Sequence, residues 1–399
     1  MAGTTGIGTT FSLPNYHGEL LAITPAETPF LTAIGGLSGG KQATSTAFEW
    51  QVSDRRSPSQ PSVLEGAAAP TAQERVRANV SNVVQIFHES VAVSYTKLAA
   101  TGQYATPSSA PYRSLDGVPN PVTSELDWQT QEAMATIASD VNFTLLNGHI
   151  DVPTSNAAAR RTAGLISVCT TNKTVEGAEL TGASTATDTI TVTHALNVND
   201  KVVFTDVGAA TNVVEGRVYY VTSKSTTVSF KVSETAGGTA ITLGTATVSL
   251  VALRTGDLTD VEINEFIQGV YDNGGMRGGN PTLLVNSAQK IAISKAYGDA
   301  YAKANPVTAN RVGGVVVDTV LTDFGALSVM LDPHVPKDAI VAASMGQIAP
   351  VFLNIPGKGV FFEEPLAKVG ASEQVQLYGE IGLEYGNERA HGVLRGLAA

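Results

Sequence analysis

The feature that most constrains the fold is an uninterrupted helical pattern in residues 121–148. Apolar residues recur along one face of it at Leu126, Ala133, Ile137, Val141 and Leu145. Neither proline nor glycine interrupts the interior, and Asn147-Gly148 is typical of a helix C-terminus. We therefore predict a helix over residues 122–147, a rod of roughly 35 Å at ~1.5 Å per residue. Such a helix is long for a globular domain.

Most of the remaining sequence is predicted to form β-strands. A length of 399 residues is too great for one simple core and indicates two or three units. With 43% hydrophobic and only 15% charged residues, the composition is typical of a folded protein that buries surface against neighbours. It therefore favours an obligate oligomer.

Charge and composition argue against several classes of protein. A net charge of −11 disfavours a globally basic nucleic-acid binder. The lone Cys169 cannot form an intrachain disulfide and is predicted to be a buried, reduced thiol. The N-terminus lacks the basic and apolar regions of a secretory signal, and no run approaches the ~20 apolar residues of a membrane span. We expect no membrane partner and folding in a cytoplasm.

The first 40 residues are rich in Gly, Thr and Pro and contain two short apolar pieces. Pro25 and Pro29 keep any helix in this segment short. Because such an arm cannot bury its apolar groups alone, we expect residues 1–40 to lie across another surface, for which a neighbouring subunit is one candidate.

Residues 41–100 are predicted to form a long two-stranded arm. Phe48, Trp50 and Val52 alternate with polar or small residues at a period of two, and residues 80–97 read as the returning strand. The tip between the strands is polar, contains three prolines and shows no regular pattern. An isolated hairpin is marginally stable in water, so this arm needs a partner surface.

The charge of this arm differs from that of the rest of the chain. Residues 41–100 contain six basic and five acidic residues, whereas the remainder contains 19 basic and 31 acidic residues. A weakly basic arm on an acidic body suits reciprocal docking between identical copies, although an ordinary solvated hairpin is the alternative. The candidate inter-subunit contact residues are Phe30, Trp50, Arg55, Arg56, Arg75 and Arg77.

Composition changes again in residues 175–253, where Thr, Val, Gly and Ala dominate. Short strand patterns follow one another here at 189–193, 201–204, 218–222, 227–232 and 248–251. This indicates a compact all-β module, and its seven acidic and four basic residues do not form a cationic face for DNA. Because helix–strand alternation resumes directly afterwards, we predict that the module is an inserted, outward-facing domain.

The C-terminal part is predicted to be mixed α/β. Thr259 and Glu262 form a capping box that opens a helix, and strand and helix patterns alternate after it. The last strong pattern places Val375, Leu377 and Ile381 on one face of a long half-buried strand. We expect this strand to pack against the long helix.

Motifs for enzyme chemistry are incomplete. Residues 35–42, GGLSGGKQ, match most of a phosphate-binding loop, but Gln42 replaces the hydroxyl that ligates Mg²⁺, and a strand pattern follows instead of a helix. The six histidines are scattered, and none pairs at helical metal-ligand spacing. No Gly-x-Ser-x-Gly motif is present, and Cys169 has no basic sequence neighbours. We predict no enzyme activity, no cofactor and no metal.

The order of these elements resembles a tailed-bacteriophage major capsid protein of the HK97 fold. The segments Thr28-Pro29-Phe30-Leu31 and Tyr385-Gly-Asn-Glu-Arg389-Ala-His-Gly-Val-Leu-Arg395 are similar to the SU10-type major head protein group. The resemblance implies an α+β, HK97-like capsid fold with an N-terminal arm, an extended β-hairpin loop, a long spine helix, a mixed α/β axial domain and an inserted all-β domain. The implied ranges are 1–40 for the arm, 41–100 for the extended loop, 101–174 for a peripheral domain with spine helix 122–147, 175–253 for the insertion, 254–365 for the axial domain and 366–399 for a strand returning to the peripheral domain.

The implied function is structural. Copies of the chain would close into hexamers and pentamers of an icosahedral shell that encloses double-stranded DNA without binding it specifically. The partners would be the chain itself, a portal, and scaffolding or decoration proteins, with assembly in the host bacterial cytoplasm before the virion is complete. Two alternatives remain: another phage structural protein, such as a tail-tube or decoration subunit, and a P-loop nucleotide-binding enzyme.

Overall fold

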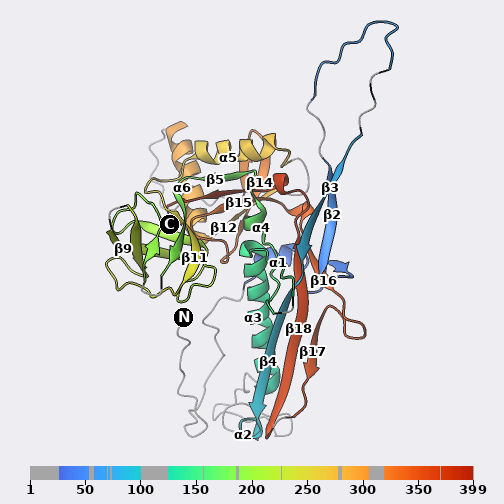
Figure 1. Cartoon of the computed structure of the whole chain (residues 1–399), viewed down its shortest axis with the longest axis vertical. Helices are drawn as coiled ribbons and strands as arrows, with labels where there is room; N and C mark the ends of the chain where they lie inside the picture. Colours follow the sequence, from blue (N-terminus) through green and yellow to red (C-terminus); the bar gives the residue numbers. More distant parts are fainter. Residues whose placement is uncertain are drawn as a thin grey trace.

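The computed structural model describes residues 27–53, 58–69, 71, 74–99, 125–155, 157–185, 188–225, 227–276, 281–304, 319–368 and 370–398. Three parts are visible in Figure 1: an elongated body, a hairpin that projects from one end of it, and a small barrel at its side. Within the described residues, no helix combines the length and the apolar character needed to cross a membrane.

The long helix α3 (Glu125–Asn147) forms the axis of the body, as predicted. It ends at Asn147, where the Asn-Gly signal predicted it to end, and residues 122–124 of the predicted range lie outside the described residues. Its apolar stripe is buried from Ala133 to Leu145, whereas Asp127 and Asp140 are exposed. The apolar residues that identified the helix in the sequence are therefore the residues through which it packs against the rest of the fold.

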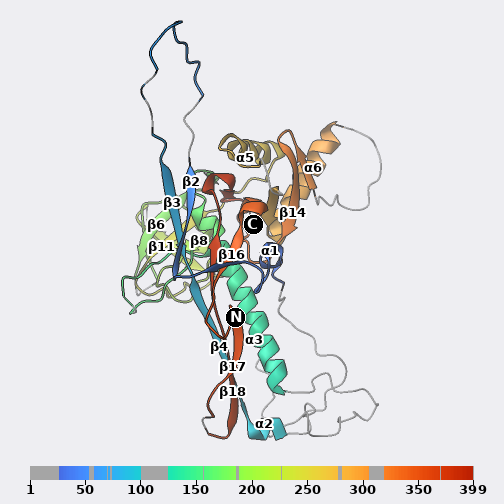
Figure 2. The ribbon, with the colours of Figure 1, turned by 90° about the vertical axis from the view of Figure 1, so that its right-hand side faces the viewer.

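A long sheet lies beside α3 (Figure 2). Its strand order is β1 (Lys41–Ala43), β16 (Ala349–Leu353), β18 (Ser372–Glu384) and β17 (Phe361–Pro365), and β4 (Gln85–Ser94) also pairs with β18. Leu377 and Ile381 of β18 share one buried core with Ile137 and Val141 of α3. The predicted packing of the closing strand against the long helix is confirmed.

The prediction of one continuous returning strand over residues 80–97 is wrong. β3 (Arg77–Val83) pairs with β2 (Ala47–Ser53), whereas β4 leaves the hairpin and pairs with β18, and α2 (Tyr95–Ala99) follows. The chain changes sheets at Val84, the residue between β3 and β4, beside the buried Asn82, whose Oδ1 accepts from the amides of Val83 and Ala163 and whose Nδ2 donates to Leu383 O. The buried face shifts by one residue across this switch, from Asn82 and Val84 to Phe87, Val91 and Val93.

The second part of the body is a six-stranded sheet with a layer of two helices (Figure 1). Its strands, in spatial order, are β13 (Thr319–Thr322), β14 (Gly325–Leu331), β12 (Pro281–Val285), β15 (Ile340–Ser344), β19 (Gly392–Arg395) and β5 (Lys173–Val175). The helices are α5 (Asp260–Asp272) and α6 (Ser287–Ala304). The predicted capping box is present: Thr259 Oγ1 accepts from the Glu262 amide, and Glu262 accepts from the Thr259 amide.

The short helices connect these layers. They are α1 (Pro29–Ile34), α4 (Leu165–Val168), and the 3₁₀ turns η1 (Met345–Gln347) and η2 (Glu388–Ala390). Cys169, which directly follows α4, is 1% exposed, and burial raises the pKa of its thiol to about 12. The predicted buried, reduced thiol is confirmed, and at neutral pH this thiol is unreactive.

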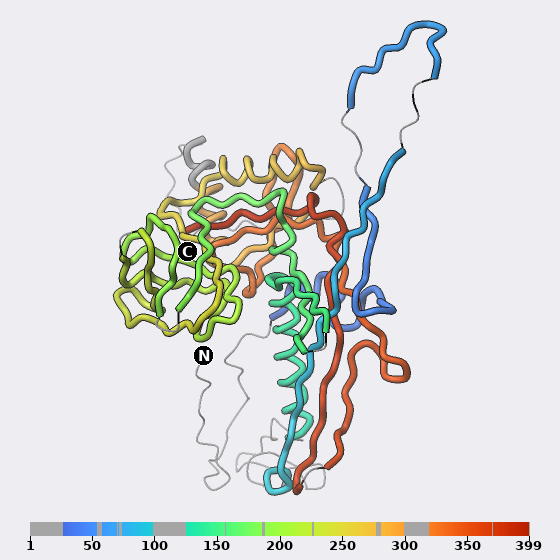
Figure 3. The backbone as a smooth tube through the Cα atoms, in the orientation of Figure 1, coloured from blue at the N-terminus to red at the C-terminus, as the bar shows by residue number. Residues whose placement is uncertain are grey.

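Residues 179–252 form a closed six-stranded barrel, coloured green to yellow in Figure 3. Its strands are β6 (Glu179–Ser184), β7 (Ile190–Thr191), β8 (Lys201–Asp206), β9 (Val218–Ser225), β10 (Ser229–Ser233) and β11 (Ala246–Ala252). Phe204, Tyr219, Phe230 and Leu250 lie in a core that belongs to the barrel alone. The predicted run of short strands is thus a closed sheet without free edges.

The two ends of the barrel meet at one narrow root. The Glu176 amide donates to Arg395 O at 2.9 Å, and the Arg254 amide donates to Gly396 O at 2.9 Å. A methyl group on Gly177 would lie 1.7 Å from Ala252 O, so only glycine permits this crossing. The chain therefore enters and leaves the barrel beside two adjacent residues of the body, Arg395 and Gly396.

Candidate assembly surfaces

The strands β2 and β3 lie against the body, and the tip that joins them extends away from it (Figure 3). Its register pairs Trp50 with Val80 and Val52 with Ala78. Along β2, Phe48, Trp50 and Val52 are half-covered, and the residues between them are exposed. This alternation confirms the period of two read from the sequence.

Trp50 fixes the base of the hairpin to the body of its own chain. Its indole Nε1 donates to Gly386 O at 2.6 Å, and its ring meets Tyr385 edge-on with 4.8 Å between centroids. The structure thus gives Trp50, one of the residues predicted at an inter-subunit contact, an anchoring role within the chain. Sequence reasoning missed its partner because Gly386 lies 336 residues away and contributes only a backbone carbonyl.

The tip of the hairpin is exposed throughout the described residues 58–69, 71 and 74–76. Three apolar side chains stand out: Val63 is 75%, Leu64 is 87% and Val76 is 79% exposed. A segment of this length with no regular structure and no core of its own cannot cover these groups. Exposed apolar patches on a folded protein mark surfaces that meet a partner.

The predicted arginine contacts divide into two pairs. Arg75 and Arg77 are exposed at the point where the tip joins β3, a position from which they can reach another molecule. Arg55 and Arg56 lie outside the described residues. A cationic contact by any of the four with a second copy stays a prediction.

A cleft of about 620 Å³ lies between the hairpin and the body. One wall is formed by Val52, Val76, Ala78 and Val80, and the other by Val168 and Tyr385, with charged residues at positions 388 and 389. This cleft could not be predicted from the sequence, because its two walls come from segments far apart in the chain.

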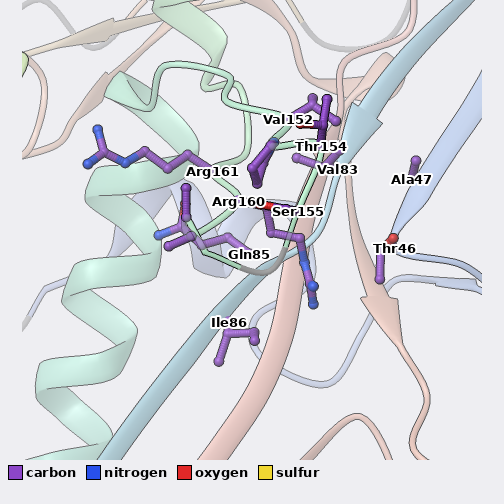
Figure 4. A pocket seen from close by; sticks show the side chains of 13 residues that line it. Thr46, Ala47, Val83, Gln85, Ile86, Val152, Thr154, Ser155, Arg160 and Arg161 are labelled. Carbon is purple, nitrogen blue, oxygen red and sulfur yellow. The ribbon is translucent and has the colours of Figure 1, made fainter.

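A second cleft, of about 460 Å³, lies where the hairpin joins β4 (Figure 4). Arg160 Nε donates to Val84 O at 2.7 Å and its guanidinium pairs with Glu380, so this side chain ties the connection after α3 to the sheet. Figure 4 shows the neighbouring Arg161 directed to the other side of the connection. Ile86 and Val152 leave an apolar, partly exposed lining.

Phe30 lies in the core of its own chain rather than on a free surface. It is 0% exposed, and its amide donates to Asp332 Oδ2 at 3.1 Å. The Leu31 amide donates to Asn142 Oδ1 at 2.8 Å, and Asn142 Nδ2 donates back to Asp332 at 3.0 and 3.1 Å. Burial opposes the charge on Asp332, but hydrogen bonds from His334, Asn142 and the Phe30 amide outweigh it and lower the pKa of this carboxyl. The network fixes α1 against the middle of α3.

The phosphate-loop signal has a structural explanation. Lys41 lies in β1, which pairs with β16, and its Nζ donates to Glu384 Oε1 at 2.8 Å. A short strand therefore occupies the place where a P-loop requires a helix.

Among the described residues, one group of side chains is close enough to hold a metal ion. It consists of His149, Asp206 and Glu215, and sequence spacing missed it because the barrel brings the two carboxylates to the histidine.

One phage capsid structure shares the architecture of this chain. The cyanophage A-1(L) capsid asymmetric unit matches with 12% identity and a TM-score of 0.52, covering 97% of this chain and 98% of that chain. The capsid of a native GTA particle and that of Mycobacterium phage Bobi each match with 11% identity and a TM-score of 0.48. The GTA match covers 100% of this chain and 99% of that one, and the Bobi match covers 98% and 97%.

By sequence, a search of curated proteins finds no match. A family model described as SU10 major capsid protein matches residues 3–398. This match spans the hairpin, α3, the barrel and the closing strand together. The chain therefore belongs to the SU10 major capsid protein family, the structural head proteins of the virion, and has the HK97-like fold of phage capsids.

Proposed function

We propose that copies of this chain close into hexamers and pentamers that tile an icosahedral head around double-stranded DNA. The observation that carries this proposal is the hairpin tip, which projects from the body with Val63, Leu64 and Val76 uncovered. Each such side chain contributes about 1.5–3 kcal/mol when it is fully buried. A neighbouring copy that covers the tip gains this energy once per subunit, and a closed ring of copies leaves no tip uncovered.

Charge supports the same arrangement. The chain has a net charge of −11, and the excess of acidic residues lies outside residues 41–100. An acidic body meets a weakly basic arm at each contact between copies, which favours the correct orientation of docking. The same acidity repels the DNA backbone, so we propose that packaged DNA is enclosed without specific binding.

We propose that the barrel is an inserted domain on the outer surface. Its separate core and closed sheet support this assignment, as does the narrow root at Gly177 and Arg254. Domains whose ends lie close together are tolerated as insertions at exposed sites. The division of the rest into a peripheral domain around α3 and an axial domain around α5 and α6 is part of the same proposal.

Three further parts of the proposal follow from the capsid role. The subunits assemble in the host bacterial cytoplasm, they meet a portal at one vertex, and scaffolding or decoration proteins act as additional partners. The protein acts by self-assembly and performs no catalysis.

The test is electron microscopy of the full-length chain expressed alone and with the other head proteins of its phage. We expect closed shells or shell fragments whose rings contain five and six copies. Tubes of stacked rings would support a tail-tube subunit instead, and a monodisperse monomer under all conditions would contradict the proposal.

A further inference from the structure

A group of three metal-ligating side chains lies where the barrel meets the body. His149 follows the C-terminal end of α3, Asp206 is the last residue of β8, and Glu215 lies in the loop between β8 and β9. One potential ligand atom from each residue lies within 4.8 Å of the other two, and all three residues are half-buried. Neither the capsid role nor the fold of the barrel requires this grouping.

Hydrogen bonds hold each of the three side chains in place. His149 Nε2 lies 2.8 Å from Thr205 O. Because a carbonyl only accepts, Nε2 carries a proton, which leaves Nδ1 as the ring nitrogen that can ligate a cation. A carbonyl partner of this kind is the usual means of orienting a metal-binding histidine.

The two carboxylates are oriented by backbone amides of the barrel. Asp206 Oδ1 accepts from the Gly208 amide at 2.8 Å, and Glu215 Oε1 accepts from the Val207 amide at 3.3 Å. Each carboxylate therefore retains lone pairs for a further partner.

The charges in this group are not balanced. Asp206 and Glu215 bring two carboxylates together in a half-buried space beside His149. Arg161, in the connection after α3, is a nearby positive charge, but among the groups that act on the Glu215 carboxyl its influence is the smallest. Two carboxylates this close repel each other, and a cation between them relieves that repulsion.

We propose that His149, Asp206 and Glu215 bind a divalent cation of the zinc class, and that this ion fastens the barrel to the body. One imidazole nitrogen with two carboxylates is a donor set that zinc accepts, whereas calcium and magnesium prefer oxygen ligands alone. In a tetrahedral site with bonds of 2.0–2.1 Å the donors lie about 3.3 Å apart. The rotatable Glu215 side chain allows the group to contract to that separation.

The proposed ion adds a bond between the barrel and the body away from the root. The root at residues 176–177 and 252–254 is covalent, and His149 with its carboxylate partners lies on other segments of both the barrel and the body. On these segments the barrel already meets the body through the contact of His149 with Thr205 O and at Gly216 beside Pro336. The ion therefore reinforces the orientation in which the barrel is held.

The experiment titrates zinc chloride into the full-length chain after dialysis against EDTA, with calorimetry and thermal unfolding as readouts. We expect one zinc ion per chain and a higher unfolding temperature, because a ligand of the folded state stabilises it. His149→Gln, Asp206→Asn and Glu215→Gln should each weaken zinc binding by at least about tenfold. Magnesium and calcium should bind more weakly than zinc.

His88→Gln and Glu234→Gln are the matched controls, because they remove a histidine and a glutamate elsewhere and should leave zinc binding unchanged. Arg161→Gln removes the competing cation and should strengthen binding, a gain that no loss of folding can imitate. Circular dichroism in EDTA checks that each variant is folded. Two results would overturn the proposal. One is that no zinc binds, and the other is that the three ligand variants leave zinc binding unchanged, which would indicate an adventitious ion only.

Discussion

The hairpin and the barrel both project from the body, but the strand edges of the hairpin are exposed, whereas those of the barrel are paired with one another. The barrel closes its six strands on one another and buries Phe204, Tyr219 and Phe230 inside. The hairpin has two strands, a free edge on each, and a tip whose Val63 and Leu64 are more exposed than any large hydrophobic residue in the described part of the barrel. A domain whose strand edges are all paired and whose apolar side chains are buried is stable without a partner. A two-stranded hairpin with exposed edges and apolar side chains needs a neighbouring molecule.

The largest effect is expected from removing the hairpin tip. Replacing residues 55–76 by a short Gly/Ser turn should leave the subunit folded, because the described part of this segment is exposed and Trp50 still anchors the base. Shell formation should be lost entirely. Electron microscopy and analytical ultracentrifugation measure the outcome, and normal shells from this variant would show that the tip is only a solvated loop.

The root of the barrel is tested by Gly177→Ala. A methyl group there would lie 1.7 Å from Ala252 O, so the crossing strands must separate. We expect a loss of about 1–3 kcal/mol in the free energy of unfolding, the typical range for overpacking in cores. Urea unfolding measures it, and Gly256→Ala is the control because nothing lies within 4 Å of the added methyl group. Equal stability of the two variants would mean that the root is loosely packed.

Acid should weaken the body before the barrel. His391 is buried in the body with Nδ1 accepting from the Ser344 amide and Nε2 near Tyr385 O, and burial lowers its pKa. In the unfolded chain this histidine takes up a proton near pH 6.5, whereas the folded state resists it, so stability falls as pH drops below that value. The slope is at most about 1.4 kcal/mol per pH unit for one proton.

The check on this pH dependence is urea unfolding followed by tryptophan fluorescence between pH 7.5 and 5, since both tryptophans lie outside the barrel. The variant His391→Gln removes the titrating group and should flatten the dependence of the free energy of unfolding on pH. A wild-type stability that stays constant over this range would contradict the assignment.

The smallest effect on assembly is expected from removing the barrel. Replacing residues 178–252 by a short Gly/Ser linker preserves the root contacts of Glu176 and Arg254 with residues 395 and 396. The shortened chain should fold and form shells, with a lower temperature of shell disruption. Differential scanning calorimetry and microscopy measure both. An insoluble product would show that the barrel belongs to the main core.

The sequence predicted well those elements whose pattern is local. The apolar stripe of α3, the Thr259 capping box and the alternation along β18 each follow from side-chain periodicity, and each is found in place. Five of the six strands of the barrel were also recognised, whereas β6 (Glu179–Ser184) was missed. The closure of these strands into a barrel was not predicted, because strand pairing depends on contacts between residues far apart in the chain.

The features that were missed depend on long-range contacts or on single side chains. The switch of pairing between β3 and β4 occurs at Val84, next to the buried Asn82, whose side chain resembles any polar residue in a strand. Phe30 was predicted on an assembly surface, but Asn142 and Asp332 hold α1 inside the fold. The cluster around His149 brings together residues 57 and 66 positions apart in the sequence, a distance at which spacing carries no information.

The most direct test of the central claim is the accessibility of the hairpin tip in free subunits and in shells. Ser62→Cys places an exposed thiol on the tip, and Val198→Cys places one on the barrel, while the native Cys169 is buried and does not react. In free subunits both new thiols should label rapidly with a maleimide. In shells, labelling at position 62 should slow by about tenfold or more, because a neighbouring copy covers the tip, and labelling at position 198 should not change. Equal labelling rates at position 62 in subunits and shells would contradict the account.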